Sequence, residues 1–257
     1  QGQYYNPDFH MMDGSKKQKE GYVSDVIEDV SENWLSNRDP NKPFCLVIGH
    51  KATHRTWIPD AQDMGKYDHI TFPLPHNFYD NYTNREAAKV QDMTISKTMQ
   101  MGYDLKMFGT ENEANKEGTI MRMNPEQRQK FDAYYGAVNA DLKSKNLSGK
   151  ELIEWKYQRY MRDYLSTAAS LDRNIGRTLD YLKEHGLEEN TIVIYLSDQG
   201  FYLGEHGWFD KRFIYEESFR TPMMMRYPAV VKPGTVSNDF VMNLDIAPTM
   251  LEAAGVA

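Results

Sequence analysis

The apolar residues of this chain recur at helical spacing in two stretches. Residues 24–35 and 152–184 both return an apolar side chain every three or four positions, which places these side chains on one face of a helix. Gly186 follows the second stretch and suits the left-handed position at which many helices end. The pattern therefore predicts a short and a very long amphipathic helix. The other face of the long helix is predicted to lie in solvent, and its charged residues are Lys156, Arg159, Arg162, Asp163, Arg173 and Lys183.

Three short apolar runs predict strands. Residues 191–196 (TIVIYL) are continuously β-branched or apolar, as in a strand covered on both faces. Residues 44–48 (FCLVI) and 222–227 (PMMMRY) predict two more strands, and 243–254 predicts a closing helix with Asp245 as its N-cap. A helix, a short loop and a parallel strand form a half-unit of an α/β fold, so we expect a sheet with helices packed against it.

Between 57 and 131 the apolar pattern weakens, and Tyr, Asn, Met, Lys and Pro become frequent. This composition predicts an irregular excursion within one partial domain that spans 1–257. Aromatic side chains in such a segment either stack on sugar rings or fill small cores. The candidates are Trp57, Phe78, Tyr79 and Tyr82.

The composition excludes several classes of partner. Lys and Arg number 30 against 37 Asp and Glu, so the basic face that a general nucleic-acid or membrane-surface binder needs is absent. No apolar run is long enough to span a bilayer, and the N-terminal residues lack the basic start and apolar stretch of a signal peptide. Cys45 is the one cysteine, which excludes an internal disulfide, and its place inside an apolar run predicts a small core residue.

Ionisable residues gather directly after the 191–196 strand. Asp198 and Gln199 stand at its carboxyl end, where ligands collect in α/β sheets, and their oxygens suit Ca²⁺ or Mg²⁺ better than a soft metal. The glycine-rich loop that follows carries His206 and Lys211, which could offer an imidazole and a positive charge to an anionic substrate. The alternative is that the Ser-Asp pair here merely forms a turn or a helix N-cap.

A second cluster, made of His50, Lys51 and His54, follows the 44–48 strand. Two strands that both end in ionisable residues indicate one shared site for a phosphate or sulfate ester, in which His54 would assist the leaving alcohol. A zinc pair made by His50 and His54 would need a helix, which the preceding strand disfavours. No nucleophile is recognisable, because no serine lies in a G-x-S-x-G turn and Cys45 lies inside a strand.

Four longer segments carry further information. They read PFCLVIGHKATHRTWIPD, YQRYMRDYLSTAASLDRNIG, SDQGFYLGEHGWFDKRFIYEES and RTPMMMRYPAVVKPG. In this order they resemble successive motifs of the type I sulfatases, within the alkaline-phosphatase-like superfamily. The resemblance covers nearly the whole chain and is greatest to bacterial N-acetylglucosamine-6-sulfatases, which act in glycosaminoglycan degradation. It implies an α/β sheet flanked by helices on both faces, a bound Ca²⁺, and hydrolysis of a glycan sulfate ester, expected to be the 6-O-sulfate of N-acetylglucosamine, by a formylglycine made from Cys or Ser.

The resemblance also implies roles for individual residues. His54 would hydrogen-bond the sulfate and the leaving oxygen, and Lys211 would hold a sulfate oxygen. Asp198 and Gln199 would be two of the calcium ligands. His206 would lie beside the site, either touching the substrate or bracing its own loop. Candidates for contact with the sulfated glycan or amino sugar are Lys211, His206, Arg55 and Trp57, together with the excursion at about 57–131.

The sequence departs from the family pattern in one respect. The formylglycine motif, Cys or Ser with Pro or Ala two residues on and Arg four residues on, is absent, as are the paired aspartates expected on the first strand. We therefore expect a central fragment without the N-terminal strands and the C-terminal subdomain, inactive by itself and belonging to a periplasmic or extracellular enzyme. Two alternatives stay open: a phosphodiesterase or phosphomutase of the same superfamily, and a non-catalytic glycan-binding fragment.

Overall fold

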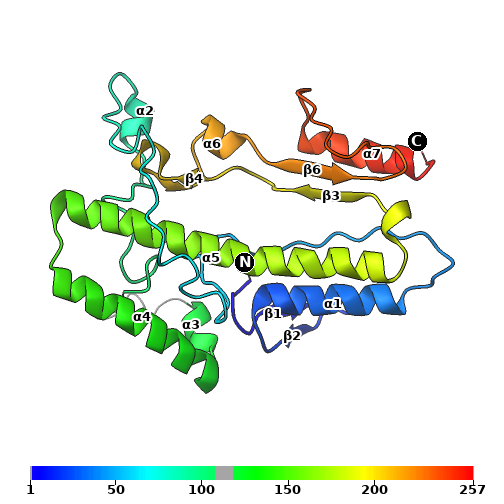
Figure 1. The fold of residues 1–257 in the computed structure, drawn as a ribbon, viewed down its shortest axis with the longest axis horizontal. Helices are drawn as coiled ribbons and strands as arrows, with labels where there is room; N and C mark the ends of the chain where they lie inside the picture. Colours follow the sequence, from blue (N-terminus) through cyan, green and yellow to red (C-terminus); the bar gives the residue numbers. More distant parts are fainter. Residues whose placement is uncertain (1, 108–117, 257) are drawn as a thin grey trace. The chain divides into compact units, whose positions relative to one another are not determined.

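The computed structural model describes residues 2–107 and 118–256 (Figure 1). Its helices are α1 (Val23–Asn37), α2 (Glu86–Lys89), α3 (Gly118–Arg122), α4 (Pro125–Lys145), α5 (Gly149–Glu184), α6 (Glu216–Phe219) and α7 (Ile246–Ala253). Its strands are β1 (Asp8–His10), β2 (Lys16–Gln18), β3 (Val193–Leu196), β4 (Tyr202–Leu203), β5 (Phe209–Asp210) and β6 (Met223–Arg226).

The chain forms two compact units. The first unit comprises Gln1–Glu184 and Tyr202–Asp210, and the second comprises His185–Phe201 and Lys211–Ala257. The β4–β5 hairpin therefore belongs to the first unit, although the residues on both sides of it belong to the second. Among the described residues the strands pair two by two, as β1 with β2, β3 with β6, and β4 with β5, all antiparallel.

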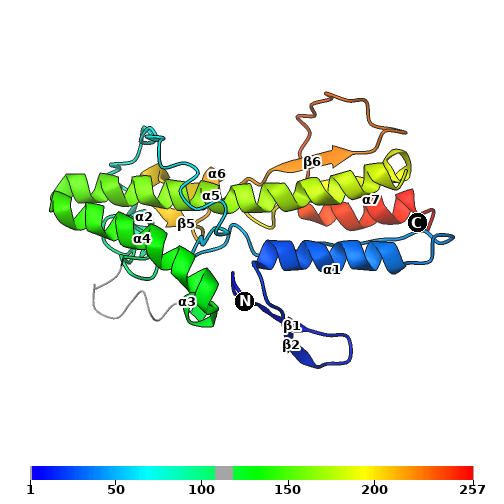
Figure 2. The same cartoon turned by 60° about the horizontal axis from the view of Figure 1, so that its bottom comes forward.

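The first unit is built along α5. Figure 1 and Figure 2 show α4 beside the N-terminal half of this helix and α1 beside its C-terminal half. The α1 contact is polar: Arg177 bonds Glu32, and Thr178 donates to the buried carboxyl of Glu28 at 2.8 Å. Both predicted helices are confirmed, and Gly186 takes the predicted left-handed conformation with φ +65°.

The predicted solvated face of α5 is wrong at three of its six positions. Three residues of its supposedly solvated face are buried: Lys156, Arg159 and Asp163. Asp163 accepts from the Lys106 ammonium at 3.1 Å, from Arg159 at 2.6 Å and from the Tyr135 hydroxyl at 3.0 Å. Two cations and a hydroxyl bond the Asp163 carboxylate, and these bonds offset the free-energy cost of burying it. Two of these partners, Lys106 and Tyr135, lie outside α5, so the spacing within the helix could not reveal them.

The core of the first unit is aromatic. Trp57 is fully buried, with its ring centroid 4.5 Å from that of Tyr160 and 6.0 Å from that of Phe209. Trp57 belongs to the 57–131 segment, whose described residues, 57–107 and 118–131, form α2, α3, the start of α4, one isolated bridge and otherwise turns or irregular backbone. The sequence reading missed α4, whose N-terminus has a capping box between Asn124 and Gln127.

The second unit contains the β3–β6 sheet and α7. The expected strands are present, and β3 pairs with β6 in the register Val193↔Arg226 to Leu196↔Met223. Within the described second unit β3 is half-buried rather than covered on both faces. Asp245 occupies the predicted N-cap position of α7, but its side chain makes no capping hydrogen bond to this helix. Its carboxylate instead accepts from the Met242 amide at 2.7 Å, which closes the 3₁₀ turn before the helix.

The strand expected at 44–48 does not form. This segment is irregular, and none of the described residues pairs with it in a ladder. Exposed and half-buried residues alternate from Pro43 to His50, as they do along an extended chain with one face against the protein. A strand exists only where a second strand accepts its hydrogen bonds. Cys45 lies on the outer face and is exposed, so the predicted core position for this residue is wrong.

Candidate functional site

His54 lies in a tight turn of the first unit. Its backbone amide donates to the Lys51 carbonyl at 2.9 Å, and its own carbonyl accepts from the Trp57 amide at 3.1 Å. The imidazole Nδ1 is 2.7 Å from the Arg55 carbonyl oxygen. Because the segment forms turns rather than a helix, His50 and His54 do not share a helical face, which removes the zinc-pair alternative.

Arg55, next to His54, is committed to an internal ion pair. Its guanidinium makes a bidentate bond with Asp104, at 2.6 and 2.8 Å, and lies 5.0 Å from the Phe209 ring centroid. Burial alone would lower the pKa of Arg55, but the hydrogen bond and charge of Asp104 outweigh it and raise the pKa. The side chain is 19% exposed. Any substrate contact by Arg55 would have to share the guanidinium with Asp104.

Trp57 does not fit a direct contact with substrate. Its relative exposure is 0%, and its ring packs against those of Tyr160 and Phe209. A side chain without accessible surface offers nothing for a ligand to touch, so its burial disfavours the predicted substrate contact at this position. Trp57 instead takes the alternative role considered for the aromatic residues of this segment, that of filling a core.

Asp198, Gln199 and Lys211 belong to the second unit. Asp198 and Gln199 follow β3, in a turn where the Ser197 hydroxyl donates to the Gln199 carbonyl at 2.8 Å. The Gly200 amide then donates to the Ser218 carbonyl at 2.9 Å. The turn is so close to α6 that a Cβ on Gly200 would lie 2.1 Å from the Glu217 carbonyl oxygen. This close packing explains the glycine after the two proposed ligands.

The ammonium of Lys211 lies 5.8 Å from the ring centroid of Phe201. Phe201 and Lys211 stand on either side of the β4–β5 hairpin, so their side chains meet where it begins and ends. Asp198 and Gln199 offer oxygens that fit Ca²⁺, which takes roughly six to eight. Among residues 2–107 and 118–256, no three His, Cys, Asp or Glu side chains gather into a metal site. The assignment of Asp198 and Gln199 as calcium ligands therefore stays a prediction.

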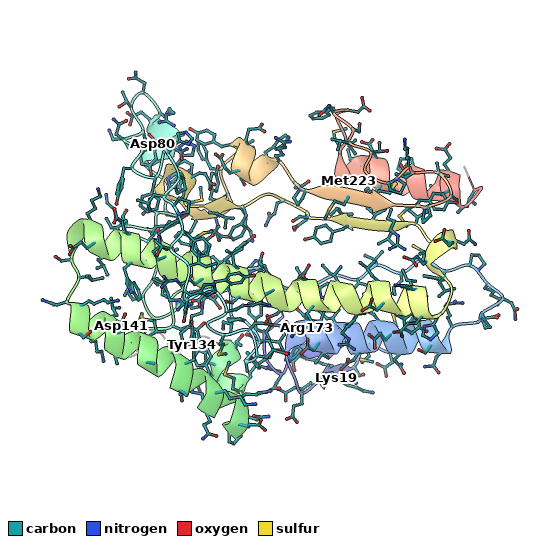
Figure 3. The ribbon with its side chains drawn as sticks, viewed as in Figure 1. Lys19, Asp80, Tyr134, Asp141, Arg173 and Met223 are labelled. Carbon is teal, nitrogen blue, oxygen red and sulfur yellow. The ribbon has the colours of Figure 1, made fainter. Side chains whose placement is uncertain are left out.

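His206 lies at the tip of the β4–β5 hairpin, in the left-handed region with φ 58°. Its Nδ1 is 2.6 Å from Asp80 and its Nε2 is 3.2 Å from the Asn77 amide nitrogen. These residues line an open cleft of about 490 Å³, together with His76, Tyr79, Asn81 and Arg85. Figure 3 marks Asp80 in the segment before α2.

The Asp80 carboxyl is ionised well below neutral pH. Burial would raise its pKa, but bonds from His206, the Tyr82 amide and Arg85 lower it to about 2. Asp80 thus presents a full negative charge to His206 and Arg85, whose side chains lie 2.6 Å from its two oxygens. The imidazole of His206 is held by this charge and by Asn77.

A family model described as Sulfatase matches residues 2–256. The chain belongs to the sulfatase family. It is 48% identical, along its whole length, to an N-acetylglucosamine-6-O-sulfatase from Bacteroides thetaiotaomicron, of which it covers 47%. A solved sulfatase structure, described as a complex with its substrate D-glucosamine-2-N,6-O-disulfate, matches all of the chain with a TM-score of 0.94 and 47% identity, and 53% of that structure is covered. The predicted family and the alkaline-phosphatase-like α/β fold class, seen here in part, are confirmed.

More distant proteins match over nearly the same range. The human N-acetylglucosamine-6-sulfatase is 24% identical across 98% of this chain, which covers 37% of that protein. The phosphonate monoester hydrolase from Silicibacter pomeroyi, at 20% identity and a TM-score of 0.57 over 99% of this chain and 43% of its own, shares the fold alone. The chain spans about half or less of the length of these relatives.

The sequence did not predict that Asp80 is the partner of His206. Asp80 is 126 positions before His206, in a segment without apolar periodicity, so nothing local connects the two. The available signal was the G-E-H-G motif at 204–207. Two glycines around a histidine indicate a tight backbone turn, and both glycines do have positive φ.

Proposed function

We propose that this chain is part of a sulfatase that hydrolyses the 6-O-sulfate ester of an N-acetylglucosamine or N-sulfated glucosamine residue in a glycan. The observation that carries the proposal is the 48% identity, along the whole chain, to the bacterial N-acetylglucosamine-6-O-sulfatase. The matched structure with a 6-O-sulfated glucosamine as substrate supports the same chemical class. The name of that relative supplies the sugar, and the residues below supply the chemistry.

In this proposal a few groups stabilise the charges of the sulfate ester during the reaction. Asp198 and Gln199 would hold Ca²⁺, and the bound ion would neutralise charge on the sulfate oxygens. Lys211 would hold another sulfate oxygen, where its ammonium stabilises the charge that develops as the ester bond breaks. His54 would hydrogen-bond the bridging oxygen and give the departing sugar alcohol its proton. The formylglycine nucleophile is expected outside these 257 residues.

The environment of His206 disfavours the phosphodiesterase or phosphomutase alternative. That alternative uses a second metal and needs His206 as a ligand. A ligating imidazole must offer a ring nitrogen to the metal. Both ring nitrogens of His206 face protein groups instead, Asp80 at 2.6 Å and Asn77 at 3.2 Å. One metal held by oxygen ligands fits the chain better than two held by histidine.

We also propose a location outside the cytoplasm, in the periplasm or the extracellular space. Two sulfatases similar over about a third of this chain are named extracellular, from Drosophila melanogaster and Caenorhabditis elegans. No helix in the described part of the chain is both long and apolar enough to cross a membrane. Fractionation of the native host, followed by detection of the protein with an antibody, tests this location.

The activity is tested on the full-length product of the reading frame that contains this chain. Mass spectrometry first establishes that formylglycine has formed, and released sulfate is then measured with N-acetylglucosamine-6-sulfate. We expect turnover that EDTA abolishes and Ca²⁺ restores, and a loss of about 100-fold or more in kcat/KM for Lys211→Ala or His54→Ala. Lys232→Ala, an exposed lysine of the second unit, is the matched control and should keep wild-type activity. Absence of sulfate release from formylglycine-containing enzyme would refute the proposed substrate.

A further inference from the structure

The β4–β5 hairpin is too short to be stable by itself. It contains two residue pairs, Tyr202↔Asp210 and Leu203↔Phe209, whereas isolated hairpins of even greater length are marginal in water. The hairpin must therefore be held by the rest of the first unit. Its conformation matters for the proposed reaction, because Lys211 is the residue directly after it.

The backbone of the hairpin is docked on residues 93–95. The Ile95 amide donates to the Gly207 carbonyl at 2.9 Å, and the Phe209 amide donates to the Met93 carbonyl at 3.0 Å. Gly207 also lies so close to the 77–85 segment that a Cβ would be 2.7 Å from the Phe78 carbonyl oxygen. Two segments of the first unit thus contact the hairpin along its main chain.

The side chains add a second set of contacts, which we call the clasp: Asn77, Asp80, Tyr82, Arg85 and His206. Asp80 and Asn77 hold the two imidazole nitrogens of His206. The Tyr82 hydroxyl donates to the His206 carbonyl at 2.5 Å, and its ring stacks on Trp208 with centroids 5.5 Å apart. Arg85 donates to the second oxygen of Asp80 at 2.6 Å. Histidine side chain and histidine backbone are therefore both fixed by one neighbouring segment.

We propose that the clasp is a positioning device for Lys211, and that His206 acts through it rather than on the substrate. The inference rests on the proposed function and deepens it. A hairpin fixed at its tip and along its backbone fixes the point from which the main chain of Lys211 departs. At the two ends of the hairpin, the Lys211 ammonium lies 5.8 Å from the Phe201 ring centroid, which favours one direction for the lysine side chain. Without the clasp, the side chain of Lys211 is no longer held in that direction.

Two variants remove the clasp from opposite sides. His206→Gly deletes the imidazole without backbone strain, because glycine accepts φ 58°. Asp80→Ala deletes its charged partner. In the full-length enzyme we expect each to lower kcat about 10- to 100-fold with a smaller change in KM, since Lys211 acts on charge that develops in the transition state. The double variant should keep the same kcat as the less active single variant, because His206 and Asp80 act as one pair.

Two further variants separate positioning from substrate binding. Asp80→Asn keeps an oxygen that can accept from His206, so it should retain several-fold more activity than Asp80→Ala. Asn81→Ala alters the wall of the same cleft, where Asn81 bonds Thr83, and should leave kcat and KM unchanged. If His206→Gly impairs turnover while Asp80→Ala does not, the imidazole acts on the substrate and the inference is wrong.

A readout without turnover distinguishes this inference from the proposed function. Amide hydrogen exchange over residues 199–213 and at Ile95 should become at least ~10-fold faster in His206→Gly and Asp80→Ala, and stay unchanged in α4. Unchanged exchange in these segments would overturn the inference even if the enzyme is an active sulfatase. If wild-type enzyme releases no sulfate, the proposed function fails, and the exchange measurement still decides whether the clasp holds Lys211.

Discussion

The two units bury their residues in different ways. The first unit has fully buried aromatic residues, among them Trp57, Tyr160 and Trp208, and it also buries Lys106 and Asp163 at 0% and 1% exposure. In the second unit none of the described side chains is buried, and apolar residues such as Met224 and Val230 are 62% and 74% exposed. Figure 3 marks Met223 of this unit on β6.

The difference shows which unit covers its apolar side chains and pairs buried charges within the described residues. The first unit pairs the buried charges of Lys106, Arg159 and Asp163 with one another, which requires each partner to be in place. The second unit presents a two-stranded sheet and a helix whose apolar side chains call for a further layer, because sheets of folded domains are covered on at least one face. Substitutions in the first unit should therefore be costly, and exposed apolar positions of the second should tolerate change until that layer is present.

The largest expected effect comes from Asp163→Ala. The substitution leaves Lys106 and Arg159 buried without their shared carboxylate, so we expect a loss of about 3–5 kcal/mol in the free energy of unfolding. Urea unfolding followed by tryptophan fluorescence measures it. The control is Asp141→Ala, which breaks a pair with Lys145 on α4 in which both side chains are about half exposed and should cost no more than ~0.5 kcal/mol. Equal losses in the two variants would remove the contrast between buried and exposed charge.

A glycine pair tests backbone packing in the first unit. Gly207 has φ +70° and its Cβ would meet the Phe78 carbonyl oxygen at 2.7 Å, so Gly207→Ala should destabilise by about 1–3 kcal/mol. Gly176, inside α5, has no atom within 4 Å of its Cβ, and Gly176→Ala should stabilise by about 0.5–1 kcal/mol. Thermal unfolding should show changes of opposite sign, and a gain at Gly207 would mean that the hairpin is loosely docked.

The same substitution in the second unit sharpens the comparison. Gly200→Ala places a Cβ 2.1 Å from the Glu217 carbonyl oxygen, so the turn after β3 must move away from α6. We expect this change to appear as faster amide exchange at position 200, whose amide donates to the Ser218 carbonyl. Exchange at an unchanged rate would contradict the close packing of this turn.

Acid should weaken the clasp of the first unit. The folded-state pKa of Asp80, about 2, lies below the ordinary value of 3.8, so its bonds stabilise fully above about pH 4 and are lost as the pH falls toward 2. The contribution should be about 1–2 kcal/mol after solvent screening. Unfolding curves of wild type and Asp80→Asn between pH 5 and 2 measure it: the difference between them should shrink with acid. A constant difference would show that charge is not its source.

The smallest effect is expected at Val230, an exposed residue of the second unit. Val230→Ser removes apolar surface that is already in water, so the free energy of unfolding should change by no more than about 0.5 kcal/mol. Ile95→Val in the core of the first unit is the matched comparison and should cost about 0.5–1.5 kcal/mol. A large loss at Val230 would reveal the covering layer in the full-length protein.

Local pattern was sufficient for several elements. The α5 helix, the β3 and β6 strands and the glycine at 186 were all predicted, because helical periodicity, short apolar runs and positive φ are properties of neighbouring residues. The motifs also indicated the sulfatase family. What the residues could not indicate is which face of α5 is buried, since Asp163 depends on Lys106, 57 positions earlier.

In the candidate site, too, local features were predictable and distant partners were not. Its residue types could be proposed from motifs, but the neighbours of each residue could not: Asp104 for Arg55, Asp80 for His206, and a core for Trp57. The 44–48 strand failed for the same reason, because pairing is a property of two segments. Roles that depend on a distant partner therefore need the folded chain.

The β4–β5 hairpin also imposes an order in time. Asp80 and His206 are 126 residues apart, and contacts across so long a loop form late because the loop must close first. At roughly 5–20 residues per second, the ribosome adds the histidine about 6–25 s after the aspartate. During that interval the 77–95 segment lacks the strands it is built to hold. At this stage the nascent chain exposes a surface that the hairpin covers in the finished protein, and chaperones and proteases can bind there.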